Sequence, residues 1–212
     1  MKMRLYKFLA IAGLFTFFAT SCGFAKAEKK DKDETTEIKD VRKIKDFHSI
    51  EIESVGDVYF TQGKNYSCEI EGEAKYVKNT IISVENQKLK IKFEKKMKNV
   101  KKGITIRITA PNLKNVSFGG VGSFVCDKRL EANDIEFNVS GVGKMEIKDL
   151  HCKKATLTLE GVGKADINVF ADKLKANVEG IGSVTLSGKV KDADLSRDGI
   201  GNIDKSGLKI GD

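Results

Sequence analysis

Apolar and polar residues alternate along the second half of the chain, and the alternation recurs in columns about twenty residues apart. The first inward column contains Phe124, Met145, Ala165, Val184 and Ile203. The next two columns contain Cys126, Ile147, Ile167 and Leu186, and then Leu130, Leu150, Phe170, Val190 and Leu208. A second strand in each repeat, such as 135–139, has the same alternation. Alternation with period two predicts strands, and a period near twenty predicts that these strands stack in parallel coils.

A pair of glycines around a Val or Ile separates successive repeats and predicts the corners of the coils. The pairs are Gly120 and Gly122, Gly141 and Gly143, Gly161 and Gly163, Gly180 and Gly182, and Gly199 and Gly201. Their first members are 21, 20, 19 and 19 residues apart. We expect the glycines to turn sharply through positive φ, and the enclosed Val or Ile to fill the core. Because no predicted helix follows them, the glycines indicate structure rather than a phosphate-binding loop.

The region from Ser49 to Phe118 is also rich in predicted strands. Residues 104–108 alternate strictly, and Ser54-Val55-Gly56-Asp57 resembles a degenerate glycine corner. Residues 74–80 predict a turn or a single short helix. We interpret this region as the first, longer coils of the same solenoid. The sequence therefore predicts one all-β domain over residues 47–212, with regular repeats from about residue 119.

The N-terminus predicts export and lipid anchoring. A basic start and an apolar stretch from Phe8 to Ala19 have the proportions of a signal peptide over residues 1–21. Small residues directly before Cys22 resemble a bacterial lipobox, so we expect this thiol to be lipidated and to hold the protein on a membrane. The alternative is an ordinary secretory peptide with a cysteine near the cleavage site. Residues 22–46 are rich in Lys, Asp and Glu, which predicts a flexible charged tether.

The charge distribution suggests one contact surface. The chain carries a formal net charge of +8. A cluster of eight lysines could contact an anionic glycan or a lipid headgroup; it contains Lys88, Lys90, Lys92, Lys95, Lys96, Lys98, Lys101 and Lys102. The alternative is a solvated hairpin loop with lysines in outward positions. These lysines lack the series of interleaved aromatic residues typical of single-stranded nucleic-acid binding, so we predict no nucleic-acid partner.

The reactive side chains do not form a recognisable metal or cofactor motif. Besides Cys22, the chain contains Cys68, Cys126 and Cys152, and its histidines are His48 and His151. No CxxC or His–Cys cluster is present, so we predict neither a metal site nor a cofactor. The three later cysteines lie beside apolar strand positions and are interpreted as small core residues.

These motifs together resemble a known family. A leading Val55-Gly56-Asp57 corner, the segment Ile106-Arg107-Ile108-Thr109-Ala110-Pro111-Asn112-Leu113 and the recurring glycine corners are similar to the head GIN domain of auto-transporter adhesins. The resemblance spans about residues 47–208. It implies a right-handed parallel β-helix-like solenoid with a pectin-lyase-like shape, a role in adhesion and no catalytic residues. It also implies a Gram-negative envelope protein, at the outer membrane, either surface-exposed or facing the periplasm.

Three functions remain open from the sequence. The first is a non-enzymatic, lipid-anchored module that binds an anionic glycan or a protein of the envelope or a host surface. The second is a structural or stress-related envelope component that forms homo-oligomers through its solenoid. The third is a carbohydrate-active enzyme, which is disfavoured because Trp is absent and because Asp127, Asp149 and Asp166 occupy different columns.

Overall fold

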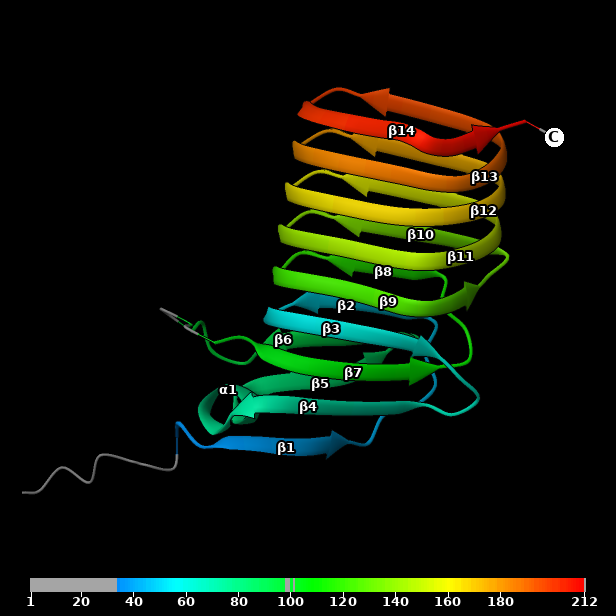
Figure 1. Ribbon diagram of the computed structural model, residues 1–212. Coiled ribbons are helices and arrows are strands. Elements are labelled where there is room, and N and C mark those ends of the chain that lie inside the picture. The colour runs from blue at the N-terminus through cyan, green and yellow to red at the C-terminus, as the bar shows by residue number, and fades with distance from the viewer. Residues whose placement is uncertain (1–33, 98–99, 101, 212) are drawn as a thin grey trace, which may run out of the picture. The chain divides into compact units, whose positions relative to one another are not determined.

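The computed structural model describes residues 34–97, 100 and 102–211, and these residues are almost entirely β-structure (Figure 1). The N-terminal elements are β1 (Glu37–Arg42), β2 (Ser49–Glu53), β3 (Val55–Gln62), β4 (Ser67–Glu73), α1 (Ala74–Lys78), β5 (Thr80–Glu85), β6 (Lys88–Phe93) and β7 (Ile104–Ala110). The repeat region contains β8 (Asn115–Phe118), β9 (Val121–Glu131), β10 (Asp134–Val139), β11 (Val142–Leu159), β12 (Val162–Val178), β13 (Ile181–Arg197) and β14 (Ile200–Ile210).

The repeats stack as parallel coils, in the register that the columns predict. Met145 pairs with Phe124 on one side and with Ala165 on the other, and the register continues through Val184 to Ile203. Each long strand bends and contributes to two faces. We call these the β9 face, which contains β3, β7, β9, the first halves of β11–β13 and all of β14, and the β10 face, which contains β2, β6, β8, β10 and the second halves of β11–β13. The predicted β-solenoid is therefore confirmed.

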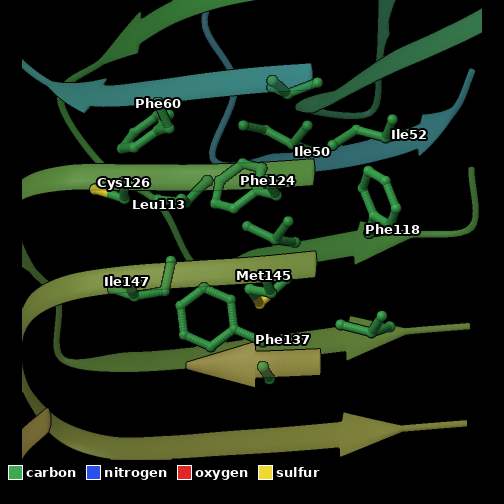
Figure 2. Packing of buried hydrophobic residues seen from close by; sticks show 14 of the residues in the cluster. Ile50, Ile52, Phe60, Leu113, Phe118, Phe124, Cys126, Phe137, Met145 and Ile147 are labelled. Carbon is green, nitrogen blue, oxygen red and sulfur yellow. The ribbon is translucent and has the colours of Figure 1, made fainter. Parts of the chain in front are cut away.

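The core lies between the two faces and is continuous along the stack. Phe118, Phe124 and Phe137 are completely buried; Phe118 and Phe124 come from the β8–β9 coil, and Phe137 comes from the next coil (Figure 2). Phe60 from β3 stacks on Phe124, with ring centroids 6.4 Å apart. Because each coil is too thin to cover its own apolar side chains, it depends on the coils above and below for burial.

The N-terminal coils do not follow one another in the expected order. The coil formed by β2 and β3 lies between the β6–β7 coil and the β8–β9 coil, because β2 pairs with both β6 and β8, and β3 with both β7 and β9. The chain leaves β3, forms β4, α1 and β5, and only then builds the coil on the far side. Here β4 and β5 pair antiparallel with β7 and β6, and α1 confirms the expected short helix. These antiparallel strands cover edges that would otherwise be open to strand addition.

The structure differs from the expected tether at residues 37–42. This segment forms β1, an antiparallel edge strand on β4. Its charged side chains have partners, since Lys39 pairs with Glu69 at 2.7 Å and the guanidinium of Arg42 donates to the carbonyl of Val77 at 3.0 Å. Ile38 packs against the core. A segment with the composition of an unfolded linker therefore forms an edge strand. Most of the rest of the expected tether from Cys22 lies outside the described residues.

The third inward column is partly wrong: from Phe170 onward, through Val190 and Leu208, its members do not pair with one another. Leu150 pairs with Leu130 on one side but with Val169 on the other, and the register shifts between Ile147 and Leu150. Val169 is therefore buried, whereas Phe170 is 38% exposed. Before this bend, β11 and β12 pair at a spacing of 20 residues, and after it they pair at a spacing of 19. A residue counted 20 positions along therefore lies on the opposite face of its strand from the one predicted.

Candidate functional site

The glycine corners owe their composition to the close approach of successive coils. A Cβ on Gly143 would lie 2.0 Å from the carbonyl oxygen of Gly122, and one on Gly163 would lie 2.0 Å from that of Gly143. The same contact with the preceding coil recurs at the other corners. Positive φ, which we expected at all ten glycines, occurs at Gly122 alone among them. The backbones pass too close for any side chain, and this excludes every residue except glycine.

The Val and Ile residues between the glycines point to solvent, and the prediction that they fill the core is wrong. We call Val121, Val142, Val162, Ile181 and Ile200 the corner ladder. They pair in register from coil to coil, and Val55 continues the series below Val121. Their exposed fractions run from 48% to 79%. Strand alternation explains the orientation: Phe124 points inward, so Val121, three residues earlier, points outward.

A shallow groove of about 320 Å³ runs beside the corner ladder. Its lining includes Glu160, every ladder residue except Ile200, and the first glycines of four corners; these glycines are Gly120, Gly141, Gly161 and Gly180. In Figure 1 this side of the stack is the one at which β9 and β11–β14 begin. The requirement for glycine thus leaves a groove next to the corner ladder.

Charged columns flank the corner ladder and the groove. On the β10 face, the residue before each corner is acidic in three successive coils, at Glu160, Glu179 and Asp198. On the β9 face, the residue after the corner is lysine in two coils, at Lys144 and Lys164. Lys144 pairs with Glu146, whereas no ion pair joins Glu160 or Lys164 to another residue in the part of the chain that the structure describes.

A second exposed cluster lies at the opposite bend of the coils. The ring of His151 stacks on that of Phe170, with centroids 4.8 Å apart. Asp149 accepts hydrogen bonds from Arg129 Nε at 3.0 Å and from His151 Nε2 at 2.8 Å. The bond from Arg129 is the main cause that lowers the pKa of the Asp149 carboxyl. Sequence reasoning missed this cluster because it placed Phe170 in the core.

The lysine cluster divides into paired and free side chains. Lys88 pairs with Glu51 and Lys90 with Glu85, both at 2.9 Å, and Lys102 pairs with Glu37 at 3.1 Å. Exposed lysines without an ion pair among the described residues follow on β6 and in the next loop; they are Lys92, Lys95 and Lys96. Asn79 holds this loop through the backbone of Lys95. Lys98 and Lys101 lie outside the described residues.

The cysteines after Cys22 are free thiols, and Cys22 itself lies outside the described residues. Cys68 and Cys126 are buried and Cys152 is half-buried. Burial raises the pKa of Cys68 to about 12 and the pKa of Cys126 and Cys152 to about 11, so these thiols stay protonated at neutral pH. Among the described residues, no group of three His, Cys, Asp or Glu side chains could hold a metal ion. In the same part of the chain, no helix is long and apolar enough to cross a membrane.

Comparisons with known proteins agree with the fold. A family model described as "Putative auto-transporter adhesin, head GIN domain" matches residues 46–212. A crystal structure of a putative adhesin from Bacteroides fragilis is 25% identical, with a TM-score of 0.67, and the match covers 81% of this chain and 98% of that one. A putative adhesin from Parabacteroides distasonis is 20% identical, with a TM-score of 0.77 and coverage of 84% and 76%. No curated protein matches the chain.

Proposed function

Because the chain belongs to the head GIN domain family of auto-transporter adhesins, we propose that it is a non-enzymatic adhesion module of a bacterial cell envelope. The observation that carries this proposal is the extent of the family match, which includes every coil of the solenoid. A stack of coils with in-register side chains presents rigid columns of outward residues. Such a surface suits the capture of an extended ligand, since little conformational freedom is lost on binding.

The chemistry of the surface favours a glycan or a glycoprotein as the ligand. Phe170 is exposed, and the half-buried ring of His151 stacks on it next to Asp149 and Arg129. Aromatic faces pack against sugar rings, and carboxylate and guanidinium groups bond to sugar hydroxyls and acids. Lys92, Lys95 and Lys96 add positive charge at a second place, which supports an anionic ligand.

Attachment to the membrane completes the proposal. Lipid at Cys22 would hold the solenoid on the outer membrane, and the charged residues after it would separate the domain from the lipid surface. The sequence before Cys22, and not the fold, supports this part of the proposal.

Substitution of Cys22 tests the anchor and the adhesion together. We expect Cys22→Ala to move the protein from the membrane fraction to the soluble fraction, because two or three acyl chains bind a membrane stably and an unmodified chain does not. Cells that produce this variant should also lose attachment to a surface coated with mucin, which presents acidic glycans on a protein. Cys152→Ala is the matched control and should change neither result. If cells with the wild-type protein attached no better than cells that lack the protein, the adhesion role would be wrong.

A structural component that forms homo-oligomers is the second candidate. The corner ladder favours it, because five exposed β-branched residues in register form a longer apolar stripe than scattered surface residues do.

A further inference from the structure

The geometry points to a parallel homodimer in which the corner ladders of two copies interlock. This interface goes beyond the proposed adhesion role and does not depend on it. The ladder contains an apolar residue in each of five successive coils, and each coil is about 4.8 Å from the next. Only a surface with the same spacing can contact every rung, and a second copy of this chain has that spacing.

The corner ladder and the groove fit a second copy of the chain that is related by a twofold axis parallel to the solenoid axis. Across the corner, the order of features is the acidic column, the glycine groove, the ladder and the lysine column. Rotation by half a turn about that axis reverses the order in the second copy. The ladder of each copy then enters the groove of the other, in the manner of a dry zipper between β-branched side chains. If the axes were antiparallel, ladder would meet ladder and groove would meet groove.

The charges select the same arrangement independently. In the parallel dimer, opposite charges meet in the central coil, while Glu179 and Asp198 face the uncharged side chains at positions 183 and 202 of the other copy. Glu160 lies opposite the partner's Lys164 in the central coil, and both side chains lack an ion pair within the described part of one copy. In an antiparallel dimer centred on the same coil, Glu160 would face the partner's Glu160, and like charges in contact oppose association.

The parallel dimer also has a consequence for attachment. It places β1 of both copies at the same end of the paired stacks, away from β14 (Figure 1). Two copies in one membrane can therefore pair without leaving it, and the pair presents two copies of the His151–Phe170 cluster. Paired binding sites increase the apparent affinity for a surface with repeated ligands.

Cysteine cross-linking of the full chain in intact cells tests the interface and its direction. In a Cys152→Ala background, Val162→Cys marks the centre of the ladder, Ile200→Cys marks one end, and Lys173→Cys marks an exposed control position at the opposite bend. After mild oxidation, we expect Val162→Cys and Ile200→Cys to form dimers and Lys173→Cys to remain monomeric. Dimers from Val162→Cys without dimers from Ile200→Cys would indicate antiparallel pairing and overturn the proposal. No dimer from either position would overturn the interface itself.

A charge exchange in the Val162→Cys chain provides a second test, which makes no further change to the ladder. In the Val162→Cys chain, Glu160→Lys places lysine opposite lysine in two symmetric pairs, so we expect the dimer Kd to rise by about tenfold. Adding Lys164→Glu restores opposite charges and should restore the yield of cross-linked dimer. If the single and double variants gave the same yield as the parent, the parallel pairing would be wrong.

Discussion

Replacement of Gly143 by alanine is expected to prevent the repeats from stacking and to lower the free energy of unfolding by at least about 3 kcal/mol. The new Cβ would lie 2.0 Å from the carbonyl oxygen of Gly122 and 3.0 Å from the Phe118 ring. The first contact is with backbone, so no side-chain rotation relieves it, and the coils must separate or bend. Urea unfolding followed by circular dichroism measures the loss.

Gly119→Ala is the matched control, next to the corresponding corner of the preceding coil. A Cβ there meets its nearest neighbour, Ser140 Oγ, at 3.4 Å, which is an ordinary contact. Its stability should therefore lie within about 0.5 kcal/mol of the wild type. Equal stability of the Gly143 and Gly119 variants would show that the spacing of the coils does not require glycine. Gly143→Val should be at least as damaging as Gly143→Ala.

Replacement of Phe137 by alanine is expected to lower the free energy of unfolding by about 3–5 kcal/mol, because the ring is completely buried between neighbouring coils (Figure 2). Removal of the ring leaves a cavity that β-strands on both sides cannot close without breaking their register. Thermal unfolding should show the change as a large fall in the midpoint temperature.

Phe170→Ala separates this effect from the loss of any phenylalanine. Phe170 is 38% exposed and contacts His151 at the surface, so its truncation should cost less than about 1 kcal/mol. The comparison also tests the register shift in β11, because the original column placed Phe170 in the core. Similar losses from the two substitutions would restore Phe170 to the core and contradict the observed register.

Periodic patterns explain why so much of the fold could be predicted. The column of Phe124, Met145 and Ala165 appears in the structure without a shift, because inward residues must repeat at the same interval as the coils. The pairing of Val55 with Val121 confirms that the degenerate corner belongs to the same stack. Both inferences depend only on local alternation and constant spacing.

The errors occur where spacing or chain order changes. Phe170 was misplaced because one residue is lost at a bend, and neither hydrophobicity nor spacing marks that residue in the sequence. The corner ladder differs from the prediction because Val and Ile are usually buried, whereas strand alternation from the buried Phe124 back through Gly122 turns Val121 outward. The position of the β2–β3 coil depends on pairing between segments far apart in the chain, which local patterns do not encode.

Surface labelling of intact cells is the most direct test of the proposed adhesion role. Lysines are exposed on many coils, so a membrane-impermeant amine reagent should reach the folded domain wherever the domain faces the medium. The adhesion account predicts that the protein is labelled as strongly in intact cells as after lysis, while a periplasmic control protein is labelled only after lysis. Labelling of this protein only after lysis would place the solenoid on the periplasmic side of the outer membrane and contradict a role in adhesion.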